Sequence, residues 1–219
     1  MKANSIVSTK SNTNTQNVTT AYRQALRTRI LDMAMQEFSR HGVRAVKMDD
    51  LAQALSISKR TLYELYSNKE DLLFEGIRKY HALQLEENTR IVESSGNVMD
   101  TLLMLYQHSV AQLRAVNPLF YTDLERYPRI VDYLRAESQR RLDGRKAFIR
   151  RGMDEGYFRR DVNIDLALHV FEILSTHMVR EGVFSLYSID DIYNSVVFLM
   201  LRGLCTERGV RRIDQFMHC

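Results

Sequence analysis

The sequence predicts an all-α fold, and three observations lead to that prediction. Only two prolines and nine glycines interrupt the 219 residues, so little in the chain would break a helix. Hydrophobic residues make up 45% of the chain, which is ample for a buried core. Apolar residues recur at helical spacing almost throughout, and no alternating segment leads into a hairpin turn.

The first helix is expected over about 22–41, where Ile30 and Phe38 belong to an apolar stripe. Gly42 follows and can take the left-handed conformation that ends a helix. Residues 1–20 are rich in Ser, Thr, Asn and Gln, a composition that predicts a disordered arm. The ordered part of the chain is therefore expected to begin near residue 21.

Two short helical patterns follow, over 48–55 and 58–66, and a tight junction at residues 55–57 separates them. Ser58 can cap the second helix, because its hydroxyl can accept from the free amides of the first turn. The outer face of that helix carries Lys59, Arg60, Thr61 and Tyr63. Such side chains suit phosphates and base edges, and the pair of helices predicts a helix-turn-helix whose second helix enters the DNA major groove.

Two runs of residues in this region resemble a known family. They read R-I-L-D-M-A-M-Q-E-F-S-R-H-G and D-L-A-Q-A-L-S-I-S-K-R-T-L-Y-E-L-Y-S-N-K-E-D-L-L. Over roughly residues 27–75 the chain closely resembles the DNA-binding domain of the TetR family of repressors. The resemblance implies that Tyr63 and Lys69 contact DNA phosphates. The residues expected to contact DNA are Lys47, Ser58, Lys59, Arg60, Thr61, Tyr63 and Lys69.

Three positions depart from the family pattern. Ser56 stands where the family usually has the glycine of the turn, and we expect serine to fit without a special backbone conformation. Lys47 replaces a threonine before the second helix, so a hydroxyl cap is lost and a cation is gained. Arg60 replaces a residue that is often small. The operator sequence therefore cannot be carried over from relatives.

A long fourth helix is predicted to start at Ser67, which stands at capping-box spacing from Glu70, and to fade around residues 91–96. It would act as a lever between two parts of the chain. We therefore expect a helix-turn-helix DNA-binding domain over 21–68 and a helical ligand-binding and dimerisation domain over 69–219.

The distribution of charge agrees with this division. The chain carries a net charge of +4, and residues 21–80 hold 11 basic and 8 acidic side chains. The remainder after residue 80 holds 18 basic and 19 acidic side chains. Excess positive charge close to the predicted helix-turn-helix is typical of a nucleic-acid-binding module, although a merely solvated basic surface would look the same.

Several classes of function find no support in the sequence. Two cysteines, Cys205 and Cys219, are too few for a disulfide framework and fit a reducing cytoplasm. No zinc-ligand spacing, phosphate-binding loop or nucleophile motif occurs, so we expect neither an enzyme nor a metal or other cofactor. No run approaches about 18 apolar residues, so we expect no contact with a membrane.

Five further helices are expected in the C-terminal domain, over about 98–115, 118–127, 130–155, 164–181 and 189–208. Asn117 and Ser188 are candidate caps, and either Asn163 or Asp161 can cap the helix over 164–181. The third of these helices is rich in arginine, and we interpret its arginines as a solvated face rather than as a pocket for an acidic ligand. They are Arg135, Arg140, Arg141, Arg145, Arg150 and Arg151.

The last two predicted helices are apolar over most of their circumference, which is typical of helices buried on several sides. One side can meet the domain core and the other a second subunit, as in the TetR arrangement, although a single thick core is the alternative. A two-fold dimer is also what a palindromic DNA site requires. We therefore expect a homodimer formed through these helices.

The middle helices are expected to line a cavity for an unknown small-molecule effector. The candidate lining residues are Met104, Tyr106, His108, Phe120, Tyr121, Tyr133, Phe171 and His177. For any one of them, packing in the core is the simpler interpretation.

The sequence as a whole predicts a ligand-responsive transcriptional repressor that binds a palindromic operator in double-stranded DNA. The alternative is a chromosome-bound structural or interaction protein whose C-terminal domain binds a protein partner. A well-formed cavity would favour the repressor, whereas a filled core with an exposed apolar groove would favour the interaction protein.

Overall fold

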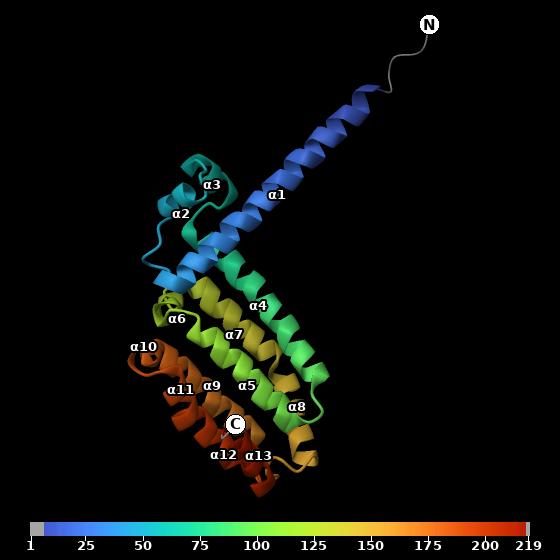
Figure 1. Ribbon diagram of the computed structural model, residues 1–219, viewed down its shortest axis with the longest axis vertical. Helices are drawn as coiled ribbons and strands as arrows, with labels where there is room; N and C mark the ends of the chain where they lie inside the picture. The colour runs from blue at the N-terminus through green and yellow to red at the C-terminus, as the bar shows by residue number, and fades with distance from the viewer. Residues whose placement is uncertain (1–6, 218–219) are drawn as a thin grey trace.

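Helices provide the regular structure of this protein, which a computed structural model describes over residues 7–217, with side chains from residue 20 onward. Helix α1 (Val7–His41) extends away from the body of the molecule, and α2 (Met48–Ala54) and α3 (Lys59–Leu65) lie beside it (Figure 1). Helix α4 (Lys69–Ser94) leads from there to the C-terminal helices. Residues 7–217 contain no β-strand, so the predicted all-α fold is confirmed.

Helix α1 begins earlier than the sequence pattern predicted. Residues 7–20 of the expected disordered arm are helical, and residues 1–6 lie outside the described part of the chain. No glycine or proline occurs before Gly42, so nothing in this stretch forces a helix to end. Ser, Thr and Asn each destabilise a helix by only up to ~0.7 kcal/mol relative to Ala. The prediction of disorder from composition gave this small penalty too much weight.

The turn between α2 and α3 has a backbone conformation that was not expected. Ser56 has a φ of 54°, in the left-handed region that favours glycine, so the expectation that serine needs no special conformation here is wrong. The amide of Ile57 donates to the carbonyl of Ala52 at 3.0 Å and closes the turn. The predicted cap of α3 is confirmed, because Ser58 Oγ accepts from the Thr61 amide at 3.0 Å.

Helix α4 starts one residue later than its predicted cap. Asn68, rather than Ser67, is the N-cap, and its Oδ1 accepts from the Asp71 amide at 2.8 Å. Both pairs have the three-residue spacing of a capping interaction, so the sequence alone could not choose between them.

The C-terminal half contains more elements than the five helices expected. They are α5 (Val98–Arg114), α6 (Pro118–Leu124), α7 (Pro128–Arg140), α8 (Leu142–Asp154), α9 (Ile164–Arg180), α10 (Val183–Leu186), α11 (Ile189–Ile192), the π-helix η1 (Tyr193–Val197), α12 (Phe198–Leu204) and α13 (Glu207–Met217). The predicted helix over 130–155 divides at Arg141, and the one predicted over 189–208 ends at Leu204. The caps at Asn117, Asn163 and Ser188 are confirmed.

Helix α13 was not expected from the sequence, and Gly209 explains how it packs. A Cβ at this position would lie 2.5 Å from the carbonyl oxygen of Tyr157, so only glycine allows the close approach. On the same helix Ile213 is fully buried. The helix thus completes the second core described below.

Two hydrophobic cores hold the chain together. The first combines residues of α1 to α4, such as Phe38, Leu62 and Leu72, with Phe120 and Ile130 from α6 and α7. The second contains Val98, Met99, Leu103, Phe158, Phe198 and Ile213. Because the first core reaches α6 and α7, α1 and α4 pack directly on the C-terminal helices.

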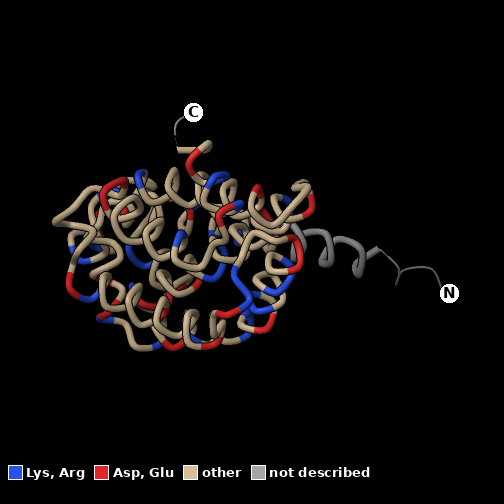
Figure 2. The backbone as a smooth tube through the Cα atoms, turned by 90° about the horizontal axis from the view of Figure 1, so that it is seen from below, with Lys and Arg blue, Asp and Glu red and all other residues tan. Residues whose placement is uncertain are grey.

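Acidic and basic residues are interleaved over the helices (Figure 2). Within residues 7–217 no helix is long and apolar enough to cross a bilayer. The same described residues contain no cluster of three His, Cys, Asp or Glu side chains that could hold a metal ion.

Candidate DNA-binding surface and ligand cavities

Helix α3 presents a polar outer face on an apolar inner one. Leu62 and Leu65 are buried against the first core, whereas Lys59, Arg60 and Tyr63 on the opposite face are exposed. Thr61 is partly buried next to Ser58, and Ser58, which caps α3, is itself exposed. A seven-residue helix with these groups turned outward has the dimensions and chemistry to enter a major groove.

The two cations of α3 are held by acids on the protein surface. Lys59 Nζ lies 2.5 Å from Asp49 Oδ2, and Arg60 Nε lies 2.8 Å from Glu64 Oε1. Hydrogen bonds to these carboxylates raise the pKa of Lys59 and of Arg60. Exposed pairs of this kind contribute little to stability, so a DNA phosphate can displace either acid at small cost.

Lys69 binds the connector between α1 and α2. Its Nζ donates to the carbonyl of Val43 at 2.9 Å and to the carbonyl of Val46 at 2.7 Å. Burial lowers the pKa of Lys69, and the nearby Asp123 carboxylate opposes that shift. One N–H of the ammonium remains for a phosphate. Lys47, at the end of the same connector, is exposed and makes no side-chain cap to α2.

The C-terminal domain holds the same connector from the other side. Asp123, buried on α6, accepts from the Arg44 amide at 2.8 Å through Oδ2. The side chain of Asn117, which caps α6, donates to the Arg40 carbonyl at 3.0 Å. Gly42 has a φ of 81°, and a Cβ there would lie 3.1 Å from the Asp123 carboxylate. The connector is therefore fitted closely between α4 and α6.

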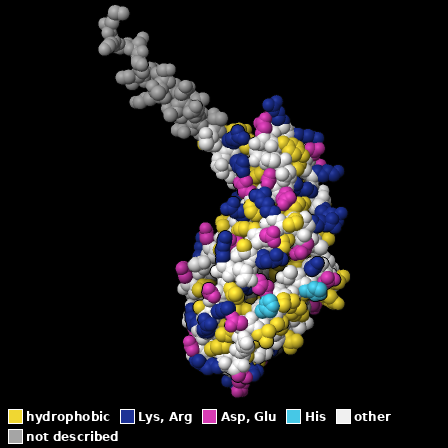
Figure 3. Space-filling model, turned by 180° about the vertical axis from the view of Figure 1, so that it is seen from behind, with side chains coloured by type: hydrophobic (Ala, Val, Ile, Leu, Met, Phe, Trp, Pro, Cys, Tyr) yellow, Lys and Arg dark blue, Asp and Glu magenta, His cyan; other side chains and the backbone are white. Residues whose placement is uncertain are grey.

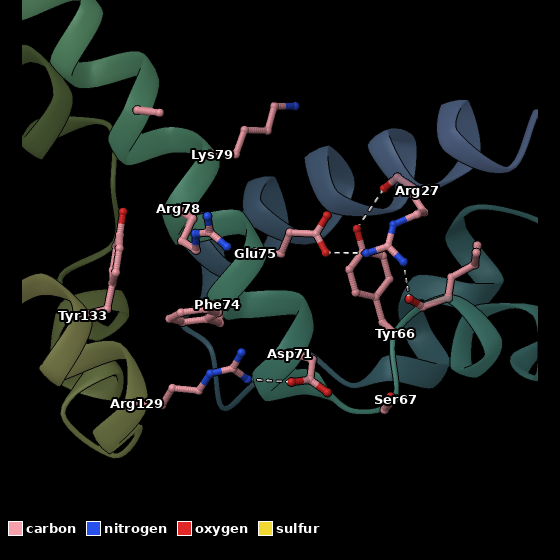
Figure 4. Close-up of a pocket in the computed structure, with 12 residues that line it drawn as sticks. Arg27, Tyr66, Ser67, Asp71, Phe74, Glu75, Arg78, Lys79, Arg129 and Tyr133 are labelled. Atoms are coloured by element: carbon pink, nitrogen blue, oxygen red, sulfur yellow. Dashed lines mark hydrogen bonds and ion pairs between the residues drawn. The ribbon is translucent and has the colours of Figure 1, made fainter. Parts of the chain in front are cut away.

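A polar groove lies between α1 and α4, and Figure 4 shows the side chains that line it. Arg27 stacks over the ring of Tyr66 at 4.6 Å and donates to Glu75 Oε2 at 2.5 Å. The same guanidinium donates to the carbonyl of Leu65, the last residue of α3. Burial is the main cause that raises the pKa of Tyr66 to about 12. Arg27, on α1, thus joins the C-terminal end of α3 to α4.

At the other end of this α1–α4 groove, Arg129 joins α7 to α4. Its guanidinium lies 3.9 Å from the ring centroid of Phe74, and it bonds Asp71 Oδ1 at 2.8 Å. Stacking on an aromatic face and pairing with a carboxylate reinforce each other, since both hold the planar guanidinium in one orientation. The start of α4 is therefore fastened to the C-terminal domain.

A cavity of about 900 Å³, which we call the domain-junction cavity, lies where α1 meets α4, α5 and α6. Met35 and Ile77 form part of its apolar wall. Three of the eight predicted pocket residues, His108, Phe120 and Tyr121, line it together. Burial raises the pKa of Tyr121 to about 12, so its hydroxyl remains protonated and can donate a hydrogen bond.

The other five predicted pocket residues lie elsewhere. Tyr133 is in the α1–α4 groove, and Tyr106 packs in an aromatic cluster against the second core. Met104, Phe171 and His177 are exposed, and none of the cavities described here contains them. Helical periodicity identifies apolar positions but does not say which side of a helix faces a cavity, and this explains the difference.

A second cavity, of about 860 Å³, was not apparent from the sequence. We call it the arginine-lined cavity. Its apolar walls include Leu85, Val92, Leu102, Phe148 and Leu168, and four arginines border it: Arg140, Arg141, Arg145 and Arg159. Arg145 is half-buried there, so it does not belong to the solvated face expected for this run. The density of arginines in residues 140–151 was the available signal.

An apolar surface runs along α9 and α12. Leu166, Val170 and Ile173 follow one another at helical spacing on α9, and 59%, 43% and 55% of their surface is exposed. Leu199 on α12 is 67% exposed. Figure 3 shows apolar side chains gathered along one edge of the lower half of the molecule. We call these four residues the α9–α12 patch, and contiguous apolar surface of this kind commonly marks an interface.

Comparison with known proteins shows a family match in the DNA-binding part of the chain. Residues 30–75, which contain α2, α3 and the start of α4, match the family model described as bacterial regulatory proteins, tetR family. This part of the protein is thus similar to the TetR family. The repressor KstR2 of Rhodococcus jostii is 26% identical over 195 residues, which cover 85% of this chain and 95% of that one. KstR2 of Mycobacterium tuberculosis is 26% identical over 143 residues, which cover 63% and 71%.

Solved structures share the fold of this protein. The structure of the ketosteroid regulator KstR2 of M. tuberculosis covers 83% of this chain and 95% of its own, with 22% identity and a TM-score of 0.57. A putative regulator from Saccharomonospora viridis in complex with choline covers 84% and 100%, with 19% identity and a TM-score of 0.67. The likeness thus extends over both the helix-turn-helix and the C-terminal helices.

The family match and the curated relatives indicate the general function. The protein is a DNA-binding transcriptional regulator, and the relatives named above are transcriptional regulators as well. The family match includes the exposed face of α3 and Lys69 at the start of α4. Lys47 and the other residues expected to contact DNA all fall inside it.

Proposed function

We propose that this regulator is a ligand-responsive repressor that binds a palindromic operator as a homodimer. In this proposal residues 21–68 bind DNA, residues 69–219 bind the effector and the second subunit, and the protein works in the cytoplasm, where a bacterial regulator meets its DNA. The observation that best supports this proposal concerns the connector between α1 and α2. Side chains from both α4 and α6 hydrogen-bond the backbone of Val43, Arg44 and Val46 in this connector.

The DNA contacts that we propose divide into two kinds. Lys59, Arg60 and Thr61 lie on the part of α3 that would face base edges, and Ser58 fixes the start of that helix. Lys47, Tyr63 and Lys69 are placed around it, where phosphates of the two strands would pass. Side chains of the second kind add affinity for any sequence, whereas those of the first kind select one.

The α9–α12 patch supports a two-fold dimer. Its apolar side chains would be removed from water in a second subunit's matching patch, and each Leu or Ile that is fully buried contributes about 1.5–3 kcal/mol. A two-fold axis would turn the two α3 helices toward successive major grooves, about 34 Å apart along the DNA.

The cavities support control by a small molecule. Both exceed 800 Å³, which suits a ligand of drug size, and both border α4. The related fold from S. viridis holds choline, which is consistent with a ligand site in this architecture. A ligand that binds more tightly to a conformation in which the spacing of the two α3 helices does not fit the operator would release the DNA. Coupling between ligand and DNA binding requires such a difference in affinity between the two conformations.

The experiment that tests this proposal is a selection of duplexes by the purified full chain from a random pool. Enrichment of an inverted repeat whose half-sites are separated by about 10 base pairs or a multiple of that is the expected result. Recovery of sequences with no common motif would overturn the proposal and favour a chromosome-bound interaction protein. Reporter expression from the selected operator, with and without the gene for this protein, then shows the direction of regulation.

A further inference from the structure

The arginine-lined cavity contains an unsatisfied pair of polar groups. In the described part of the chain, only two buried side-chain N or O atoms lack a hydrogen-bond partner, Asn88 Oδ1 and Arg145 Nε. Both residues line this cavity, Asn88 from α4 and Arg145 from α8. Buried polar groups in proteins are nearly always satisfied, so two unsatisfied groups on residues that line one cavity indicate a missing partner.

Arg145 is held in place but keeps its charge available. Its Nη2 donates to the carbonyl oxygen of Ser138 at 2.9 Å and to Ser138 Oγ at 3.0 Å. No carboxylate among the described side chains lies within 4.0 Å of the Arg145 guanidinium, whereas Glu137 pairs with Arg140 and Asp161 pairs with Arg159. The cavity therefore contains a positioned cation whose charge no acid neutralises.

Glu172 does not neutralise the charge of Arg145. Glu172 on α9 reaches the same group of residues, but its Oε1 accepts from Ser138 Oγ at 3.2 Å. Ser138 thus lies between the acid and Arg145 and bonds both. This arrangement fixes the guanidinium from one side and leaves its Nε–H without an acceptor.

The walls of the arginine-lined cavity restrict which kind of ligand can supply an acceptor for Arg145 Nε. They are largely apolar, with Leu85, Leu102, Phe148 and Leu168 among them, and the volume of about 860 Å³ suits a body of drug size. An inorganic anion would satisfy Arg145 but leave these walls uncovered, and a neutral hydrocarbon would leave a buried cation unpaired.

We propose that the arginine-lined cavity binds an amphipathic organic anion, with one anionic oxygen that accepts from Arg145 Nε, another that accepts from Asn88 Nδ2 once the side-chain amide has turned over to place its nitrogen where Oδ1 now lies, and an apolar body against the remaining walls. The inference rests on the proposed ligand-responsive function and names the chemical class of the effector. Asn88 lies on α4, the helix that begins at Lys69, and Arg145 lies on α8. A ligand that bonds both would fix α4 relative to α8 and thereby shift the helix-turn-helix.

The test is calorimetry on the full chain with three probes of equal length: dodecanoate, 1-dodecanol and dodecylamine. Dodecanoate binds about tenfold more tightly than the alcohol or the amine if the proposal holds, because a hydrogen bond to a charged group is worth a factor of that order. Equal affinity for the three probes, or no binding of dodecanoate, would overturn it.

Two cavity variants locate the anion. Arg145→Met keeps the volume, removes the charge and should abolish the preference for dodecanoate. The matched control is Arg140→Met, which removes an arginine of the same cavity that Glu137 already neutralises, and it should keep the preference. Asn88→Leu should weaken the binding of dodecanoate about fivefold. This variant provides a second measurement if Arg145→Met does not fold. Retention of full preference in either test variant would contradict the proposal.

A separate measurement distinguishes failure of this inference from failure of the proposed function. Dodecanoate is titrated into the complex of the protein with its selected operator. Binding that depends on Arg145 and leaves the DNA bound would support the anion site and contradict control by ligand. Release of DNA by dodecanoate in wild type but not in Arg145→Met would support both.

Discussion

The Asp123 carboxylate on α6 accepts a hydrogen bond from the Arg44 amide at 2.8 Å, and this bond joins the C-terminal domain to the connector that carries the helix-turn-helix. Lys69 holds the same connector from α4 through Val43 and Val46. A movement of α6 relative to α4 must therefore be transmitted to α2 and α3. In the proposed function this connector is the physical link between the effector site and DNA.

Replacement of Asp123 by alanine should destabilise the protein. The Arg44 amide would lose the Asp123 carboxylate as its acceptor, and leaving a buried hydrogen bond unmade costs about 1–3 kcal/mol. Urea unfolding followed by circular dichroism measures the loss. The control is Asp132→Ala, because that side chain is 74% exposed in an ion pair with Arg135 and should leave stability nearly unchanged. Equal stability of the two variants would refute the role of Asp123.

Replacement of Lys69 by alanine should weaken binding to every DNA sequence. A lost phosphate contact lowers the dependence of log K on log salt concentration by about one. Binding measured by fluorescence anisotropy at several salt concentrations gives that slope. Lys79→Ala is the control, since Lys79 lies further along α4 and pairs with Asp32 at 2.5 Å. A slope that stays the same in the Lys69 variant would argue against the phosphate contact.

Substitutions at Ser56 should follow its left-handed backbone. A β-branched side chain is disfavoured at a φ of 54°, so Ser56→Val should lower the free energy of unfolding by about 1–2 kcal/mol. Ser56→Gly removes the strain but loosens the unfolded chain, so it should change stability by less than about 1 kcal/mol. Denaturant titration measures both. A valine variant as stable as the glycine variant would mean that the turn is not strained.

His81 should make stability depend on pH. Burial and the nearby Arg141 lower the pKa of His81 below its ordinary value of 6.5, against the opposing charge of Glu137. As the pH falls below about 6.5, the unfolded chain takes up a proton that folded His81 resists, so the free energy of unfolding decreases. Melting temperatures between pH 7.5 and 5 should therefore fall less steeply for His81→Gln than for wild type.

The glutamine at position 81 can still bond the Tyr133 hydroxyl, which lies 3.1 Å from His81 Nδ1. His41→Gln serves as the comparison, because the side chain of His41 is 59% exposed. The explanation fails if the two histidine variants show the same dependence on pH as each other.

Replacement of Leu199 by glutamate should give a monomer. Leu199 is 67% exposed in the single chain, and a buried carboxylate at a two-fold interface would face its own copy without a partner. Sedimentation velocity at micromolar concentration reports the oligomeric state. Leu83→Glu is the matched control, because Leu83 is 49% exposed on α4, away from the α9–α12 patch. A dimer in the Leu199 variant would exclude α12 from the interface.

Local signals in the sequence predicted the helix-turn-helix well. Ser58, Asn117, Asn163 and Ser188 all cap helices as their spacing indicated, because a cap depends only on residues three positions apart or fewer. The start of α4 shows the limit of the same rule. Ser67 and Asn68 both have side chains that can cap a helix, and the structure uses Asn68.

The cavities could not be predicted, because they depend on which faces of distant helices meet. Phe120 and Tyr121 line a cavity while Phe171 on α9 is exposed, although all three are aromatic residues in helices. Arg145 and Arg140 belong to one arginine-rich run, yet only Arg140 has an acid beside it. Glu137, three residues before Arg140, is a local signal that separates the two arginines, whereas no local pattern separates Phe120 from Phe171.

The central claim is that two α3 helices, related by a two-fold axis, read one palindromic site. Hydroxyl-radical footprinting of the selected operator with the full chain tests it most directly. Two protected patches of equal strength should appear on one face of the duplex, about one helical turn or a multiple apart, and both should vanish together when the protein is diluted. A single patch, or protection spread evenly over the duplex, would contradict the claim.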